Sequence, residues 1–154
     1  MNETQIRLFN QSKICFQKLQ YLSSIHDCFY KNINLRILRT DMYKFICIKL
    51  NDVNDLCNYS KTLDTSIFLF DLFVKEILEE FELKNSNNSN CFNINHYKKY
   101  LLDASQVCMI MAIKLFESHP FDIIKCHFNN CHGNNTFISL EYEILMKVGG
   151  KLCV

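Results

Sequence analysis

A carboxylate inside an apolar run is the residue of this sequence that most clearly invites a chemical explanation. Asp71 lies within residues 67–74, Ile-Phe-Leu-Phe-Asp-Leu-Phe-Val. A buried carboxylate without a partner is costly, so Asp71 lies either on a narrow exposed stripe or against a cation. Arg39 is the natural partner, because a guanidinium offers a carboxylate two parallel hydrogen bonds. The spacing alone leaves the solvated and the paired alternatives equally open.

Lys114 is a charged residue in a comparable position, near the end of a second apolar segment over 96–116. A lysine there can extend its ammonium group to the surface along apolar neighbours, or lie near the carbonyl end of a helix. From the residues alone, these structural roles are favoured over a functional one.

Two adjacent Cys-His pairs, Cys126-His127 and Cys131-His132, carry side chains that bind zinc. A structural zinc site needs four ligands on a compact scaffold. The CHxxxCH pattern stands in an Asn-rich segment without a second pair at zinc-finger spacing. We therefore predict no metal site here.

The sequence contains no motif of a known catalytic site. GxSxG, HExxH and Gly-rich phosphate loops are absent, and three glycines are too few to build a nucleotide cradle. A Cys–His nucleophile pair can be drawn from almost any chain with nine cysteines and five histidines, so such a pair carries no weight.

Apolar residues recur at helical spacing along most of the chain. The helices expected from this pattern cover 5–30, 35–50, 62–83, 96–116 and 136–148, and 121–128 fits a short helix. Polar segments over 51–59, 84–95 and 129–135 are expected to be loops. Asn135 or Thr136 is the expected cap of the last helix.

The expected helices over 62–83 and 96–116 are apolar on almost every side. Helices of this kind lie inside a protein, surrounded by other helices. Flanked by amphipathic helices, they predict an all-α bundle with a central buried helix.

Length and composition agree with one domain that buries a core. The chain has 154 residues, of which 49% are hydrophobic, with three Gly and one Pro. This composition argues against a disordered chain and against a turn-rich all-β fold. A formal net charge of +1 creates no strong field for nucleic acid or an anionic membrane.

The cysteines and the N-terminal residues favour a reducing, intracellular location. The nine cysteines include no CxxC pair, and the first residues lack an apolar run of signal-peptide length. The longest strongly apolar stretch, 107–113, is far shorter than the roughly 20 residues of a transmembrane helix. We expect a nuclear or cytoplasmic protein that has no contact with membranes.

Four parts of the chain, in order, resemble helices of a cyclin box. The parts that resemble its first, second, third and fifth helices are LRTDMYKF at 38–45, TLDTSIFLFDLFV at 62–74, Leu101-Leu102 with AIKLFESHP at 112–120, and LEYEIL at 140–145 with KLCV at 151–154. The third of these parts is similar to the family's Ala-x-Lys-x-x-Glu-x-x-Pro ending. Together they cover roughly residues 38–154.

The C-terminal LEYEILMKVGGKLCV most resembles the single-box P-type cyclins, the phosphate-pathway group. The resemblance implies an all-α fold, with a five-helix cyclin box over 35–154 and an additional N-terminal helix within 1–34. It also implies a regulatory protein of the cell cycle or of nutrient responses, with no enzymatic activity and no cofactor.

The resemblance assigns roles to four residues. Lys114 and Glu141 match the pair that hydrogen-bonds the mobile helix of a cyclin-dependent kinase and the loop before it. Arg39 and Asp71 match an internal ion pair between the first two helices, which favours burial of Asp71. Such a subunit activates the kinase by binding the active arrangement of the mobile helix, which completes the kinase's own Lys–Glu ion pair.

Some positions depart from the family pattern. Leu72 stands where the family has a basic residue after the aspartate. Asp41, Met42 and Phe45 interrupt the apolar patch with which some cyclins bind their substrates. Leu102 occupies a position of that patch that is usually polar. We therefore do not expect this substrate-docking function in the chain.

A second function remains open: a cyclin-fold scaffold or adaptor that binds partners without activating a kinase. A cyclin-fold nucleic-acid binder is disfavoured by the net charge of +1. A small cysteine-based enzyme ranks last.

Overall fold

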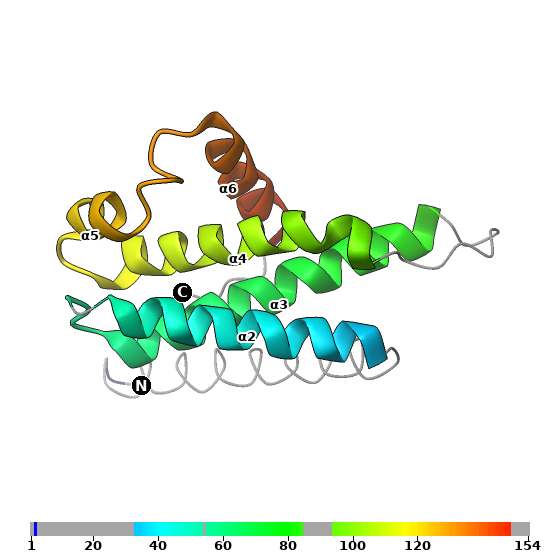
Figure 1. Cartoon of the computed structure of the whole chain (residues 1–154), viewed down its shortest axis with the longest axis horizontal. Coiled ribbons are helices and arrows are strands. Elements are labelled where there is room, and N and C mark those ends of the chain that lie inside the picture. Colours follow the sequence, from blue (N-terminus) through cyan, green and yellow to red (C-terminus); the bar gives the residue numbers. More distant parts are fainter. Residues whose placement is uncertain (1, 3–32, 54, 85–93, 149–154) are drawn as a thin grey trace.

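The chain is all-α over the residues that the structure describes. A computed structural model describes residue 2 and residues 33–53, 55–84 and 94–148. Its helices are α2 (Ile33–Asp52), α3 (Tyr59–Lys84), α4 (Ile94–Phe116), α5 (Pro120–His127) and α6 (Asn135–Val148) (Figure 1). Within these ranges there is no strand.

Helix α4 is the centre of the bundle. It packs against α2, α3, α5 and α6, and α3 also packs against α2 and α6. In Figure 1, α2, α3 and α4 lie side by side, α6 crosses over α4, and α5 follows the C-terminal end of α4. Most residues over 101–113 of α4 are buried, as predicted for a helix that is apolar on nearly all sides.

The apolar run of α3 is buried around the whole helix circumference. Every residue over 69–75 is buried, including the full side chains of Phe70 and Phe73. Burying a large apolar side chain contributes about 1.5–3 kcal/mol relative to leaving it exposed, so this run stabilises the bundle strongly. No helix in the described ranges is both long and apolar enough to cross a membrane.

The helix caps differ from those expected. Asn134 caps α6 rather than Asn135 or Thr136, because its Oδ1 accepts a hydrogen bond from the backbone N–H of Thr136 at 2.9 Å. Pro120 is the first residue of α5, where the missing N–H of proline would have no partner within the helix. Helices α5 and α6 thus start from residues suited to a first helical turn.

Several predictions fall on residues outside the described ranges. These are the helix over 5–30, most of the segment 1–34, and the C-terminal residues 151–154. Helix α2 begins at Ile33, and helix α3 extends through Lys84, where a loop was predicted to begin. Most of that loop also lies outside the described residues.

Candidate functional site

Arg39 and Asp71 form a buried ion pair that joins α2 to α3. The Arg39 guanidinium donates from Nε to Oδ1 of Asp71 at 3.0 Å and from Nη2 to Oδ2 at 2.8 Å. The Asp71 side chain has no exposed surface, and the Arg39 side chain is 27% exposed. The carboxylate inside the apolar run is therefore paired through both oxygens and is not solvated.

Tyr43 is a third member of this site, which we did not identify from the sequence. Its hydroxyl donates to Oδ2 of Asp71 at 2.5 Å and accepts a hydrogen bond from Arg39 Nη2. The Arg39 guanidinium carbon lies 4.5 Å from the centre of the Tyr43 ring. Burial, followed by the charge of Asp71, raises the pKa of the Tyr43 phenol, so the hydroxyl remains a donor. The spacing of four residues places Arg39 and Tyr43 on one helix face, and Tyr43 could have been identified from this feature of the sequence.

Lys114 and Glu141 form a second interhelical ion pair, at the surface. Lys114 lies in the last turn of α4 and Glu141 in the middle of α6. Lys114 Nζ donates to both carboxylate oxygens of Glu141, at 2.9 and 3.1 Å. The lysine side chain is 36% exposed and the glutamate side chain 25%. The structure thus brings together the two residues that the family resemblance singles out.

Helix α6 is apolar on two faces, and only one of them is covered by the described bundle. The inner face is buried and consists of Leu140, Ile144 and Val148. The outer face is exposed and consists of Ile138, Tyr142, Leu145 and Met146. Glu141 lies three residues from Ile138 and four from Leu145, so it borders the outer face. A helix that is apolar on both sides is typical of one that a partner covers.

Side chains outside this outer face anchor α6 to the bundle. Lys147 Nζ donates to Oε1 of Glu80 on α3 at 2.5 Å. Tyr100 on α4 pairs with Glu143, and burial together with this hydrogen bond raises the pKa of the Tyr100 phenol. These contacts fix the helix that carries Glu141.

The Cys-His pairs do not form a site. Cys126 is exposed, whereas the buried Cys131 donates its thiol proton to Oε1 of Gln106, with 3.2 Å between the heavy atoms. Burial raises the pKa of the Cys131 thiol to about 11, so it is protonated at neutral pH and a poor ligand or nucleophile. Across the described part of the chain, no three His, Cys, Asp or Glu side chains gather where a metal ion could bind.

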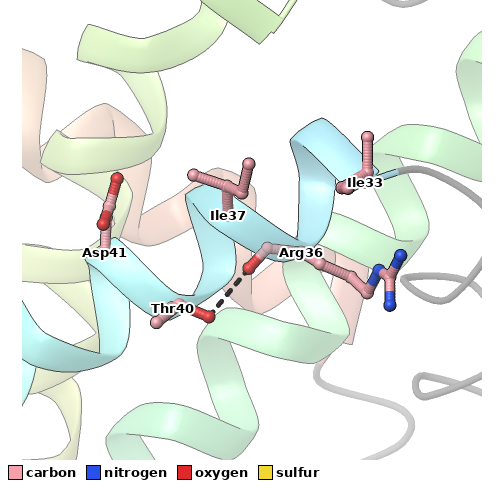
Figure 2. A pocket seen from close by; sticks show the side chains of 5 residues that line it. All are labelled: Ile33, Arg36, Ile37, Thr40 and Asp41. Carbon is pink, nitrogen blue, oxygen red and sulfur yellow. Dashed lines mark hydrogen bonds between the residues drawn. The ribbon is translucent and has the colours of Figure 1, made fainter.

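A shallow hollow lies along the exposed side of α2. Figure 2 shows its lining residues, Ile33, Arg36, Ile37, Thr40 and Asp41. The Thr40 hydroxyl donates to the backbone carbonyl of Arg36 at 2.9 Å, a bond within the helix. All the lining residues belong to one helix, so the hollow does not bring together polar groups from several elements as catalytic pockets do.

Four of the five positions at which the chain departs from the cyclin pattern pack in or against the core. Leu72 is fully buried, and Met42 is 5% exposed. Phe45 and Leu102 are partly buried against the same core, whereas Asp41 is exposed. The apolar side chains at these positions therefore contribute to packing.

No protein-family model, curated protein or solved structure matches the chain. The resemblance to cyclins thus stays a prediction from the residues. Support for a function comes from the Arg39–Asp71 and Lys114–Glu141 pairs and from the outer face of α6.

Proposed function

We propose that this chain is a cyclin-type regulatory subunit that binds and activates a cyclin-dependent kinase. The observation that carries the proposal is the surface of α6, where the Lys114–Glu141 pair borders an uncovered apolar face. This surface offers a hydrogen-bond donor and acceptor beside apolar side chains. An amphipathic partner helix needs both kinds of contact.

A single cyclin box is the fold that we propose for α2 to α6. In the family pattern, the first, second, third and fifth helices carry an Arg, an Asp, a Lys and a Glu. Here α2 carries Arg39, α3 carries Asp71, α4 carries Lys114 and α6 carries Glu141. The correspondence of helix order and paired side chains supports this fold, and the helix within 1–34 remains a prediction.

The Lys114–Glu141 pair keeps hydrogen-bonding capacity for a partner. A lysine ammonium has three donors and a carboxylate accepts about four hydrogen bonds, so the two contacts between them do not exhaust either group. The remaining donor suits a backbone carbonyl and the remaining lone pairs suit backbone N–H groups. Such groups are available where the kinase's mobile helix begins and in the loop before it.

Activation then follows as a shift of population in the kinase. The surface of α6 binds the mobile helix in its active position better than in its inactive position, so binding favours the active kinase. In that position the helix supplies the glutamate of the kinase's Lys–Glu ion pair, which phosphoryl transfer requires. The chain itself contributes no catalytic group.

The test is a binding and activity assay with a panel of purified cyclin-dependent kinases. We expect the chain to bind one kinase and to raise its phosphorylation of a peptide substrate. Lys114→Glu and Glu141→Lys each place like charges at the site, and each should weaken binding by about 2 kcal/mol or more, about thirtyfold. Circular dichroism should show unchanged helix content.

A matched control comes from the other lysine–glutamate pair of α6. Lys147→Ala breaks the contact with Glu80 away from the outer face and should leave kinase affinity unchanged. A chain that binds a kinase without raising its activity would support the adaptor function instead. Failure to bind any kinase, with an intact fold, would overturn the proposal.

A further inference from the structure

The carboxylate of Glu117 closes the N-terminal end of α3. Glu117 follows the last residue of α4 and is 7% exposed. Its Oε2 accepts a hydrogen bond from the backbone N–H of Cys57 at 2.8 Å, and its Oε1 accepts one from Asn58 N–H at 3.0 Å. The Thr62 hydroxyl lies 3.4 Å from Oε1. A carboxylate is favourable here because N–H groups at a helix start lack intrahelical partners and carry partial positive charge.

Asn58 makes the reverse contact with the end of α4. Its side-chain Nδ2 donates to the backbone carbonyl of Phe116, the last residue of α4, at 2.7 Å. That carbonyl is one of the four at a helix C-terminus that have no intrahelical partner. We name this reciprocal arrangement of Glu117 and Asn58 the end clasp. It joins the start of α3 to the end of α4 across about 60 residues of sequence.

We propose that Glu117 is a positioning residue for Lys114. Lys114 lies in the turn that the end clasp holds, and the N–H of Glu117 closes that turn on the carbonyl of Ile113 at 3.0 Å. Terminal helical turns fray when their polar groups lack partners. A frayed turn would move Lys114 Nζ away from the Glu141 carboxylate on α6, which it now contacts at 2.9 Å. The use of this positioning for kinase binding rests on the proposed function.

Glu117→Gln tests the end clasp with little change of size. The amide keeps one acceptor oxygen and presents an NH2 group to one of the two backbone N–H donors, so one contact is lost. We expect amide hydrogen exchange over residues 113–117 to accelerate by about tenfold, with little change in the middle of α4. Unchanged exchange at 113–117 would overturn the proposal.

The reactivity of lysine side chains separates positioning from a general loss of stability. A nearby carboxylate favours the charged ammonium over the neutral amine that acetylation requires, so separating Lys114 from Glu141 should raise its acetylation rate severalfold. Lys147, in its own pair with Glu80, is the internal reference and should not change. Equal increases at both lysines would mean that Glu117 acts only on overall stability, which would overturn the proposal.

Kinase affinity gives the third measurement. Glu117→Gln should weaken binding about tenfold in the wild-type background and have little effect when Lys114 is already alanine, because the two changes then act on one contact. Equal losses in both backgrounds would overturn the positioning role. Accelerated exchange and selective acetylation of Lys114 in a chain that binds no kinase would support the end clasp and overturn the proposed function.

Ile46→Val is the matched control for stability. Ile46 is a fully buried core residue of α2. The change removes one buried methyl group, which lowers the stability of the whole fold without altering a residue of the end clasp. It should leave the relative acetylation of Lys114 and Lys147 unchanged. A selective rise at Lys114 in this variant would overturn the assignment to Glu117.

Discussion

Two of the ion pairs between helices, Arg39–Asp71 and Lys114–Glu141, have similar bond lengths and different surroundings. The shortest N–O distance is 2.8 Å between Arg39 and Asp71 and 2.9 Å between Lys114 and Glu141. Asp71 has no exposed surface, whereas the Lys114 and Glu141 side chains keep 36% and 25% of theirs. Distance alone therefore does not tell which pair stabilises the fold and which remains accessible to a partner.

Burial decides how much each ion pair contributes to the stability of the fold. Removing one partner of a buried pair leaves an uncompensated charge in a medium that solvates it poorly, which costs about 3–5 kcal/mol. An exposed pair competes with water and with side-chain entropy, and contributes about 0–1 kcal/mol. The buried pair is thus a structural contact between α2 and α3. The exposed pair can exchange water for a protein partner at little cost.

The largest expected effect is that of Arg39→Ala. It leaves the Asp71 carboxylate buried without its cation, and we expect the free energy of unfolding to fall by about 3 kcal/mol. This value is at the lower end of the range for buried pairs because part of the Arg39 side chain is exposed. Urea unfolding followed by circular dichroism measures this loss.

Lys44→Ala, on the exposed side of the same helix, is the control for Arg39→Ala and should change stability by less than about 0.5 kcal/mol. A loss of under about 1 kcal/mol from Arg39→Ala would place both ion pairs in the same energetic class. The comparison between them would then fail.

A smaller loss is expected from Tyr43→Phe, which removes the hydroxyl that donates to Asp71. A hydrogen bond to a charged group contributes more than a neutral one, so we expect a decrease of about 1–2 kcal/mol at neutral pH. The ring, which lies against the Arg39 guanidinium, is kept. No measurable loss would show that Arg39 alone compensates the buried carboxylate.

Alkaline pH sharpens the same test. The pKa of the Tyr43 phenol is raised above its ordinary value of 10.0 in the folded protein, so the folded state holds this proton more tightly than the unfolded chain does. The stabilisation is complete below pH 10 and is lost as the pH rises above that value. The wild type should therefore lose stability more steeply than Tyr43→Phe above pH 10, as measured by urea unfolding at several pH values.

The helices could be predicted because each carries a local signal. Helical periodicity and the fully apolar runs place α3 and α4 within a few residues of their observed bounds, and burial around α4 follows from its composition. The partner of Asp71 could be named because a buried carboxylate requires a cation and Arg is suited to it. Nothing in the spacing could show that the pair forms, since residues 39 and 71 lie on different helices.

Contacts between distant residues escaped prediction for the same reason. Glu117 accepts hydrogen bonds at the start of α3 from Cys57 and Asn58, although neither lies near it in sequence. Tyr43 could have been found from its position one turn after Arg39, but a tyrosine on an amphipathic helix has many ordinary roles. Helix ends depend on such tertiary partners, and this is why their bounds were the least accurate part of the prediction.

Breaking the exposed pair should have a much smaller effect on stability. Lys114→Ala and Glu141→Ala should each lower the free energy of unfolding by less than about 1 kcal/mol, because water replaces the lost partner. Thermal unfolding of the two single variants and the double variant measures the coupling between them. A coupling above about 2 kcal/mol would assign this pair a structural role like that of Arg39 and Asp71.

The smallest expected effect concerns the outer face of α6. Met146 is 68% exposed, so Met146→Ala should change the free energy of unfolding by no more than about 0.5 kcal/mol. Ile144→Ala, two residues earlier on the inner face, should cost about 2–5 kcal/mol, because it leaves a cavity in the core. Urea unfolding of both variants compares two apolar residues of one helix that differ in burial.

A loss from Met146→Ala as large as that from Ile144→Ala would mean that the outer face is already covered in the free chain. With no such loss, weaker binding of the proposed kinase partner by Met146→Ala would show that Met146 makes its contacts only in that proposed complex.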